Sequence, residues 1–499
     1  MAGFLIAIDQ GTTGSTVLVL SEQAEILGRA TREFTQRFPQ PGWVEHDPED
    51  IWASVTDALG EALRAASIAP GDCAAVGITN QRETTLLWDR GTGKAAYNAI
   101  VWQDRRTAAR CAELRDAGLE PMFRERTGLV FDPYFSGTKL EWLLDNVEGA
   151  RSRADSGELA FGTIDSFLLH RLTAGAAHAT DATNASRTLL YDLRRHCWDP
   201  ELAAALRIPP AVLPRVGGCA EIYGRTRGVP GLADGIPIAG VAGDQQAAMF
   251  GQNCFALGDA KCTYGTGAFL LVNTGIEPVR SSHGLITTVA WRLGKETTYA
   301  LEGSAFIAGA AVQWLRDGLK LIHAAADVEA LASQVESSGE VVFVPALAGL
   351  GAPYWDPLAR GLLSGITRDT SAAHIARAAL EGIAFQIDDL AQAMTQDATR
   401  PLARLRVDGG ASQNDLLMQL QADLSNLPID RPLCVETTAL GAAYLAGLAV
   451  GVFSDPDAIA EVHRIERTFV PRQAPEQRDR NRRKWREAVS RARSRTTTP

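Results

Sequence analysis

Hydrophobic runs alternate with helical patterns along the chain, and this alternation predicts an α/β fold. Three β-prone runs open the sequence, at residues 4–8, 16–20 and 26–34. A helix is expected at residues 48–66, because Asp47 can cap it, Pro48 suits its first position and apolar residues then recur at helical spacing. Another buried strand is expected at residues 74–79. The chain therefore begins with a β-hairpin rather than with a strand, loop and helix.

The same pattern starts again after about residue 250. Residues 260–264 and 268–272 are β-prone and are joined by a Gly-Thr-Gly turn, much as a Gly-Thr-Thr turn joins the first two runs. Further strands are expected at residues 341–344 and 405–407, and helices at residues 371–394 and 414–424. This repetition suggests an internal duplication. We expect two α/β lobes, residues 1–250 and 251–499, with a cleft between them.

The composition is that of a soluble globular protein with large buried cores, since 46% of the residues are hydrophobic and 22% are charged. No run of about 18 apolar residues suggests a membrane span, and the first residues do not resemble a signal peptide. The seven cysteines are scattered without a Cys-x-x-Cys pair, which argues against a zinc site or a disulfide framework. We therefore expect a cytoplasmic protein without membrane insertion.

Nucleic-acid binding is not expected, because the net charge is −10. One basic run stands out, from Arg478 to Arg495, with Trp485 and Val489 on one side. We interpret this run chiefly as a solvated terminal helix. An acidic protein can still bind ATP, because backbone N–H groups and a metal ion hold phosphates locally.

The two glycine-threonine turns are candidate phosphate-binding loops. The sequence has no Gly-x-x-x-x-Gly-Lys-Ser/Thr segment, so a P-loop is excluded. The glycines allow the backbone to approach an anion, and Thr12, Thr13 and Thr266 add hydroxyl donors. Each turn alone fits an ordinary hairpin equally well. Asp9, at the end of the first strand, favours the phosphate-binding interpretation because it could orient a hydrated Mg²⁺ ion.

Three polar segments follow predicted strands and carry candidate chemistry. Asp244 comes directly after a buried run and is a candidate general base for a hydroxyl that attacks phosphorus, although a lone aspartate is more often a cap or turn residue. Arg82 and Glu83 offer a forked donor beside an acceptor, which suits adjacent hydroxyl groups; by themselves they suggest a surface ion pair. Asp408-Gly409-Gly410 precedes a predicted helix and resembles a nucleotide-facing loop.

In their order along the chain, these segments resemble the FGGY carbohydrate kinase family. The matching segments are residues 8–13, 78–84, 102–106, 132–139, 183–187, 243–246, 264–267, 351–355 and 408–410. The resemblance implies two actin-like lobes, each built on a ribonuclease-H-like core, with ATP and substrate meeting in a catalytic cleft. It also implies ATP-dependent phosphorylation of a small polyol with Mg²⁺ as cofactor, and a homo-oligomer, dimer or tetramer. Glycerol, converted to sn-glycerol 3-phosphate, is the acceptor that the residue set favours.

The family pattern also implies a role for individual residues. Asp244 would be the general base, and Asp9 would lie near Mg²⁺. The residues implied in acceptor binding are Arg82, Glu83, Trp102, Tyr134, Asp244, Gln245 and Phe269. Those implied in binding the nucleotide are Thr12, Thr13, Gly14, Thr266, Gly309, Gln313, Gly410 and Asn414. A site that hydrogen-bonds each hydroxyl can reject analogues lacking one by about 10⁴–10⁵-fold.

Two positions depart from the family pattern. An arginine usually stands in the first phosphate loop where this chain has Thr16, so we expect nucleotide binding to be weaker but activity to survive. Members inhibited by fructose 1,6-bisphosphate carry a glycine-rich loop with an arginine. The equivalent stretch here, residues 230–235, has no basic residue and includes Asp234, so we expect weak or absent inhibition.

Two alternative functions remain open from the sequence. One is a kinase of the same family that acts on another polyol or ketose, such as erythritol or xylulose. The other is an actin- or chaperone-like ATPase, which predicts slow ATP hydrolysis without a small acceptor. An acceptor-dependence assay separates all three.

Overall fold

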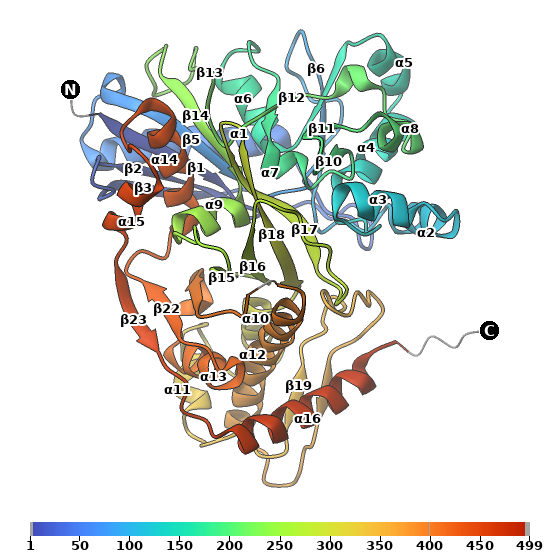
Figure 1. Ribbon diagram of the computed structural model, residues 1–499, viewed down its shortest axis with the longest axis vertical. Helices are drawn as coiled ribbons and strands as arrows, with labels where there is room; N and C mark the ends of the chain where they lie inside the picture. The colour runs from blue at the N-terminus through green and yellow to red at the C-terminus, as the bar shows by residue number, and fades with distance from the viewer. Residues whose placement is uncertain (1–2, 399, 495–499) are drawn as a thin grey trace.

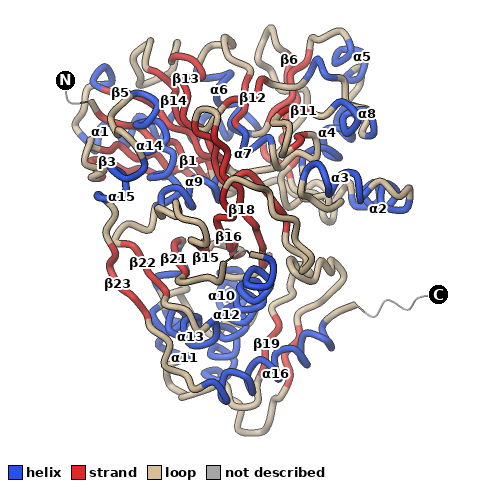
Figure 2. The backbone as a smooth tube through the Cα atoms, in the orientation of Figure 1, coloured by secondary structure: helices blue, strands red, loops and turns tan. Residues whose placement is uncertain are grey.

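The computed structural model describes residues 3–398 and 400–494 and contains one large mixed sheet in each half of the chain (Figure 1, Figure 2). The first sheet has the strand order β13-β14-β5-β1-β2-β3. Its strands are β1 (Phe4–Gln10), β2 (Gly14–Leu20), β3 (Ile26–Glu33), β5 (Cys73–Asn80), β13 (Ala220–Arg225) and β14 (Pro237–Gly243). The predicted α/β fold is confirmed.

The second sheet has the order β17-β18-β16-β15-β21-β22-β23. Its strands are β15 (Ala260–Tyr264), β16 (Ala268–Gly275), β17 (Ile286–Leu293), β18 (Glu296–Ala305), β21 (Leu405–Asp408), β22 (Ile429–Pro432) and β23 (Ile465–Phe469). Both sheets share one arrangement: β1 is antiparallel to β2 and parallel to β5, as β15 is antiparallel to β16 and parallel to β21. This equivalence is the duplication that the two hairpins predict.

Every strand and helix named from the sequence is present, with ends within three residues of the expected ones. The expected helices are α1 (Pro48–Ala66), α12 (Ala372–Asp397) and α13 (Asp415–Ser425), and the strand expected at 341–344 is β19 (Val342–Val344). Asp47 caps α1, since its side chain accepts a hydrogen bond from Glu49 N at 3.0 Å. Most of the chain between β5 and β14 forms smaller elements, including α2 (Ala108–Asp116), α3 (Glu120–Thr127), α4 (Ser136–Asn146), α5 (Ala150–Asp155), α6 (Ile164–Leu172), α7 (Ala182–Ala185) and α8 (Pro200–Ala205).

A helix from the C-terminal half, α14 (Thr437–Val450), packs against the first sheet and against α9 (Asp244–Gly251). The approach is close enough to require glycine. A Cβ at Gly77 of β5 would lie 2.1 Å from the carbonyl oxygen of Ala442, and one at Gly441 would lie 1.8 Å from that of Ala247. This contact fixes α9, whose first residue is Asp244.

The hairpin of β17 and β18 reaches from the second sheet toward the N-terminal half (Figure 1). Thr288 Oγ1 lies 2.9 Å from Ser186 Oγ, and Tyr299 donates to the carbonyl oxygen of Leu193 at 2.6 Å. Each half therefore packs an element against the other half: α14 contacts the first sheet, and the β17–β18 hairpin contacts the N-terminal half.

The basic C-terminal run forms α16 (Pro475–Ala492), and the interpretation as a solvated helix is wrong for the face that carries Trp485 and Val489. Trp485, Ala488 and Val489 are buried, and the Trp485 ring stacks on Phe385 of α12 at 5.1 Å. Arg482 forms an ion pair with Asp388 at 2.7 Å. Arg495 lies outside the described residues.

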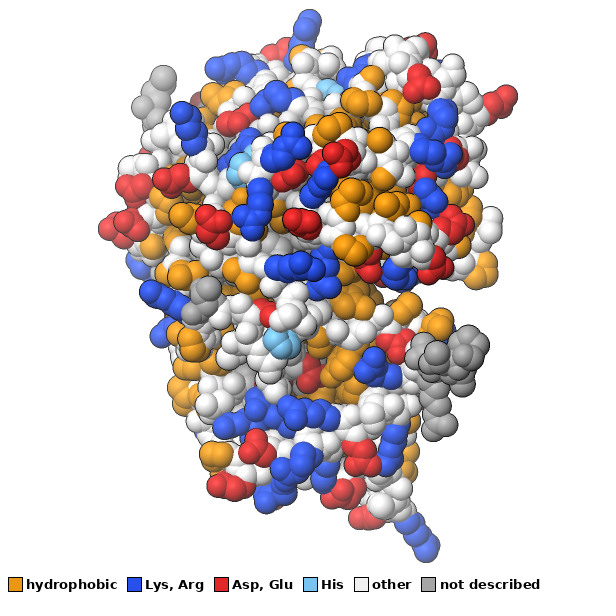
Figure 3. Space-filling model, turned by 45° about the vertical axis from the view of Figure 1, so that its right-hand side comes forward, with side chains coloured by type: hydrophobic (Ala, Val, Ile, Leu, Met, Phe, Trp, Pro, Cys, Tyr) orange, Lys and Arg blue, Asp and Glu red, His pale blue; other side chains and the backbone are white. Residues whose placement is uncertain are grey.

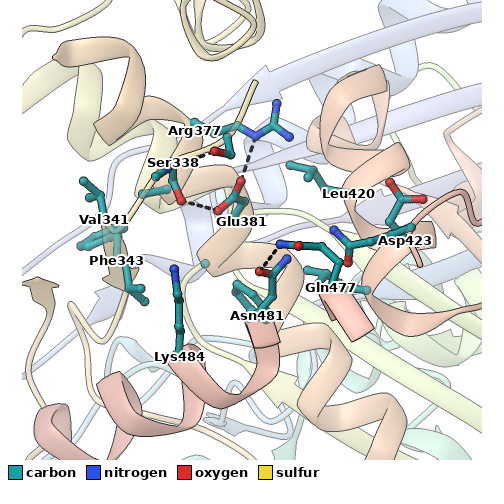
Figure 4. Close-up of a pocket in the computed structure, with 18 of the residues that line it drawn as sticks. Ser338, Val341, Phe343, Arg377, Glu381, Leu420, Asp423, Gln477, Asn481 and Lys484 are labelled. Atoms are coloured by element: carbon teal, nitrogen blue, oxygen red, sulfur yellow. Dashed lines mark hydrogen bonds and ion pairs between the residues drawn. The ribbon is translucent and has the colours of Figure 1, made fainter. Parts of the chain in front are cut away.

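Figure 4 shows the cavity of about 150 Å³ that α16 helps to enclose. Gln477, Asn481 and Lys484 face it from α16, opposite the ion pair between Arg377 and Glu381 of α12. The inner face of α16 is thus part of the lobe, and its outer face carries the exposed arginines.

Asp389 links α12 to α16 and should make stability depend on pH. Its Oδ2 accepts from Trp485 Nε1 at 2.7 Å and from Tyr354 at 2.8 Å, and burial raises the pKa of Asp389 to about 7. Because the folded-state pKa is raised, this carboxyl stabilises the fold below its ordinary pKa of 3.8, and the contribution is lost as pH rises toward 7. Asp389→Asn keeps the acceptor oxygen and removes the titration. We expect the stability of Asp389→Asn relative to the wild type to be greater at pH 8 than at pH 5. Urea unfolding at the two pH values measures this difference.

The matched control is Asp479→Asn on the exposed side of α16. Asp479→Asn should shift the urea midpoint equally at both pH values. An equal shift for Asp389→Asn at pH 5 and pH 8 would contradict the prediction.

Candidate active site

A cavity of about 380 Å³ lies where the ends of strands from both sheets meet. It is lined by Thr12, Thr13, Gln36, Phe38, Arg82, Glu83, Trp102, Gln103, Tyr134, Asp244, Gln245, Thr263, Gly265, Thr266, Gly267, Phe269 and Gln313. Every residue expected to bind the acceptor is among them. The face drawn in Figure 3 is indented between the upper and lower parts of the molecule, with acidic and basic side chains interspersed on either side.

A second cavity, of about 500 Å³, adjoins the first and shares Gly265, Thr266 and Gln313 with it. Its lining includes Gly309, Gln313, Gly410 and Asn414, the residues expected to line the nucleotide site, together with apolar Val312, Val328, Leu380 and Leu417. The larger cavity is therefore suited to a flat, partly apolar ring, and it leads into the smaller polar one.

The first glycine-threonine turn is held from behind by polar side chains. Gly11 N donates to Gly14 O at 2.8 Å, and Gln36 Nε2 donates to Thr12 O at 2.9 Å. Trp102 Nε1 donates to Thr12 Oγ1 at 2.9 Å, which ties the wall of the polar cavity to the turn. Gly14 supports the turn through its carbonyl and is not among the residues that line either of these two cavities.

The second turn is fixed by the start of α10 (Gly309–Asp317). Gly309 N donates to Gly265 O at 2.9 Å, and Ala308 N donates to Thr266 O at 2.8 Å. A third backbone segment completes the edge of the larger cavity at Gly409, which has φ of +83°. A Cβ there would lie 2.6 Å from Tyr264 O, so the close approach requires glycine.

Three aromatic rings form the apolar wall of the smaller cavity. Trp102 meets Tyr134 edge-on at 5.7 Å and Phe269 edge-on at 6.2 Å between ring centroids. The guanidinium of Arg82 lies 5.8 Å from the Phe269 ring. A short carbon chain can pack on these rings while its polar groups face the opposite side.

Arg82 and Glu83 form the polar wall, and the interpretation of this pair as a surface ion pair is wrong. Their side chains are 2% and 1% exposed, and Arg82 Nε lies 3.8 Å from Glu83 Oε1. Glu83 also has a positive φ of 60°, in the left-handed region that few non-glycine residues adopt. A buried donor beside a buried acceptor can recognise hydroxyl groups specifically, because water does not satisfy either group when a hydroxyl is missing.

Asp244 begins α9, at the C-terminal end of β14, and 29% of its side chain is exposed to the cavity. Its Oδ1 lies 3.2 Å from Arg82 Nε and accepts from Gln245 N at 2.7 Å. Burial raises the pKa of Asp244 above its ordinary value, although the charges of Arg82 and Lys261 act in the opposite direction. A carboxylate with a raised pKa is a better general base near neutral pH.

Asp9 lies near the end of β1, directly before the first turn, and is the residue expected near Mg²⁺. Burial first, and then the charges of Asp244 and Glu436, raise the pKa of Asp9 well above its ordinary value. Among the described residues, no cluster of three or more His, Cys, Asp or Glu side chains could hold a metal ion alone. Mg²⁺ is commonly bound by one or two carboxylates with phosphates and water completing the shell, so these acidic groups fit such an ion.

The sequence analysis missed three charged residues that support the site. Glu302 and Arg187 are fully buried and bond directly to Arg82 and Glu83, while Lys261 Nζ donates to Gln245 Oε1 at 2.5 Å. A signal was present, because Lys261 is the single charge in the β-prone run 260–264 and Glu302 is the single charge in residues 297–315. Arg187 belongs to a segment that matched the family without being given a role.

Comparison with known proteins agrees with this geometry. Residues 4–251 match the N-terminal domain, and residues 260–450 the C-terminal domain, of the FGGY family of carbohydrate kinases. A glycerol kinase of Myxococcus xanthus is 59% identical over 98% of this chain and 99% of its own length; that of Aromatoleum aromaticum is also 59% identical, over 98% and 99%. A crystal structure of Plasmodium falciparum glycerol kinase with ADP is 37% identical, with a TM-score of 0.90 over 98% of both chains. None of the helices in the described ranges is long and apolar enough to cross a membrane.

Proposed function

The chain belongs to the FGGY family of carbohydrate kinases, and from this premise we propose that it transfers the terminal phosphate of ATP to glycerol, giving sn-glycerol 3-phosphate. The observation that carries the proposal is the pair of adjoining cavities. The smaller one has an apolar wall, a hydrogen-bonding wall and a carboxylate, and it opens into the larger one. The near-full-length relatives named glycerol kinase support the choice of acceptor.

In this proposal Asp244 takes the proton from the primary hydroxyl of glycerol as that oxygen attacks phosphorus. Its partly exposed side chain can reach a ligand in the cavity, while the contacts of Oδ1 with Arg82 and Gln245 hold it at the start of α9. The raised pKa of Asp244 favours proton acceptance at neutral pH. The carboxyl group carries the proton away from the reacting oxygen and needs no second protein base.

The remaining acceptor contacts divide between the two walls. Arg82 and Glu83, with Tyr134 and Gln245, would hydrogen-bond the hydroxyl groups, and Trp102 and Phe269 would pack against the carbon chain. A longer polyol places an additional carbon and hydroxyl against the aromatic wall. We therefore expect the cavity to discriminate by length as well as by hydroxyl number.

The phosphates would lie between the two glycine-threonine turns, held by Thr12, Thr13, Thr266 and backbone N–H groups. The nucleotide base and sugar would occupy the larger cavity, beside Gly309, Gln313, Gly410 and Asn414. A Mg²⁺ ion near Asp9 would neutralise phosphate charge when bound. Gly14 would act indirectly, by holding the first turn.

A coupled ADP-release assay tests the proposed function. The protein is given Mg-ATP with glycerol, dihydroxyacetone, glyceraldehyde, erythritol or xylulose, or with no acceptor. We expect ADP release to depend on glycerol and the product to be sn-glycerol 3-phosphate. Preference for a longer acceptor would keep the chemistry and replace the substrate, and acceptor-independent release would instead support an ATPase.

The proposal extends to the lobe boundary, the location, the assembly state and the loop at residues 230–235. The division at residue 250 is a prediction, and α14 and the β17–β18 hairpin cross between the halves. We also propose a cytoplasmic location, a homo-oligomeric state and no binding of nucleic acid. The loop at residues 230–235, in which Asp234 accepts from Gly228 N at 2.7 Å, is expected to give weak or no response to fructose 1,6-bisphosphate.

Thr16 lies directly opposite Asp9 in the pairing of β1 with β2, so both side chains are on one face of the sheet. Thr16→Arg would add a cation beside Asp9 and the first phosphate turn. We expect the KM for ATP to fall about threefold or more, because charge-assisted hydrogen bonds to phosphate are strong. Steady-state kinetics at saturating glycerol measures this change.

Gln23→Arg is the matched control, since Gln23 is exposed in the turn after β2, at the opposite end of that strand from the first phosphate turn. It should leave the KM for ATP unchanged. An unchanged or higher KM in Thr16→Arg would count against a phosphate-binding role for the first turn.

A further inference from the structure

A buried ionic cluster lies behind the polar wall of the acceptor cavity. Glu302 is on β18, between Leu301 and Gly303, and its side chain is fully buried. Arg187 follows α7 and is also fully buried. Within the described part of the chain, neither residue lines the acceptor cavity. Burial of a charge costs free energy unless it is paired, so the contacts of these two residues explain why they are tolerated.

Glu302 holds two arginines with its two oxygens. Oε2 accepts from Arg82 Nη1 at 2.5 Å, and Oε1 accepts from Arg82 Nη2 at 3.1 Å, which makes a bidentate pair. Oε1 also accepts from Arg187 Nη2 at 2.8 Å. Burial would raise the pKa of Glu302, but the charges of Arg187 and Arg82 outweigh it and hold the pKa below its ordinary value. Glu302 therefore remains ionised.

Arg187 extends the cluster to the second residue of the polar wall. Its Nε donates to Glu83 Oε1 at 2.6 Å, while its Nη2 bonds to Glu302. The guanidinium also lies over the rings of Tyr134 and Phe135, at 5.5 Å and 5.3 Å. Arg187 thus connects Glu302 with Glu83 through one rigid, planar group.

The bidentate pair fixes the direction in which Arg82 presents its other donors. With Nη1 and Nη2 turned toward Glu302, Nε faces Asp244 at 3.2 Å and Nη2 also donates to Tyr134 at 3.1 Å. A guanidinium is planar, so fixing one edge fixes the others. Without Glu302, Arg82 could rotate toward Asp244 or Glu83 and lose its alignment with the cavity.

We propose that Glu302, acting with Arg187, is a positioning residue that sets the geometry of Arg82 and Glu83 for the acceptor's hydroxyl groups. The carboxylate comes from a strand of the C-terminal half, whereas Arg82, Glu83 and Arg187 come from the N-terminal half. The acceptor site is therefore completed only where β18 meets the N-terminal half. This inference rests on the proposed function, because it assumes that the smaller cavity holds the acceptor.

The proposal predicts a selective effect on the acceptor. Glu302→Gln keeps the side-chain volume but removes the charge and one of the two acceptor oxygens. We expect the KM for glycerol to rise at least about tenfold, and kcat/KM for glycerol to fall about a hundredfold, because the polar wall is misaligned. The KM for ATP should stay within about twofold, since the turns that hold the phosphates are not part of this cluster.

Asp388→Asn is the matched control, because Asp388 is also a buried carboxylate in a bidentate pair, with Arg482 at 2.7 Å for both bonds. It lies on α12, and its loss should lower thermal stability while leaving both KM values unchanged. An effect of Glu302→Gln on stability alone, with both KM values as in the wild type, would overturn the proposal.

Arg187→Lys provides a second variant in case Glu302→Gln does not fold. Lysine keeps the charge that balances Glu302 and Glu83, but its single ammonium cannot replace the two separate N–H contacts of the guanidinium. We expect a raised KM for glycerol with an unchanged KM for ATP, and an unchanged KM for glycerol would also overturn the proposal. If the wild type does not phosphorylate glycerol, the proposed function fails. If the wild type phosphorylates glycerol and both variants keep its KM for glycerol, only this inference fails.

Discussion

Asp244→Asn is expected to lower kcat for glycerol phosphorylation by about 10²–10⁴-fold, the usual contribution of a general base. Asparagine keeps the shape of the side chain and one oxygen for the contact with Arg82, but it cannot accept the proton of the attacking hydroxyl. Glycerol binding should change little, because the other groups of the polar wall remain. The ADP-release assay measures kcat, and calorimetry without nucleotide measures glycerol binding.

The pH profile gives a second measurement of the same role. A base must be deprotonated to act, so kcat/KM of the wild type should fall as pH drops through the raised pKa of Asp244. The residual activity of Asp244→Asn should lack this decline. The control is Asp234→Asn, the same change in the exposed loop at residues 230–235, which should retain wild-type kcat. If Asp244→Asn kept more than about a tenth of the wild-type kcat, Asp244 would not be the base.

Local patterns in the sequence predicted the strands and turns that we propose to hold the phosphates. The hairpin at β1 and β2 depends on alternating apolar residues and a glycine-rich turn, both of which act over a few residues. The cap at Asp47 likewise placed the start of α1 correctly. Asp244 and Arg82 could be selected because each follows a buried strand, where ligands of open α/β sheets tend to bind.

Burial and pairing between distant residues could not be predicted in the same way. Arg82 is buried because Glu302, 220 residues further along the chain, accepts its charge. The pair therefore looks like a surface feature until the tertiary contact is known. The packing of α14 on the first sheet has the same origin, since Gly77 and Ala442 meet only in the folded chain. The family resemblance supplied the expected roles of the cavity residues. The supporting contacts of Glu302, Arg187 and Lys261 came from the structure.

Trp485→Ala is expected to lower the free energy of unfolding by about 3–5 kcal/mol, the usual cost of truncating a buried aromatic side chain. Trp485 is 1% exposed, and its ring is within 11° of parallel to that of Phe385. Its removal leaves a void between α12 and α16 and takes one hydrogen-bond donor from Asp389. Urea unfolding followed by circular dichroism measures the loss. The KM values of the folded variant should be unchanged, because α16 contributes no residue to the acceptor or nucleotide cavity in the described ranges.

Arg483→Ala, on the exposed side of the same helix, separates the two interpretations of α16. A solvated helix would tolerate both substitutions, each changing stability by no more than about 0.5 kcal/mol. A docked helix tolerates only Arg483→Ala. Because Trp485 is one of three buried residues in a segment that is otherwise strongly polar, a large loss at Trp485 alone would show that a narrow apolar stripe is enough to hold α16 on the lobe.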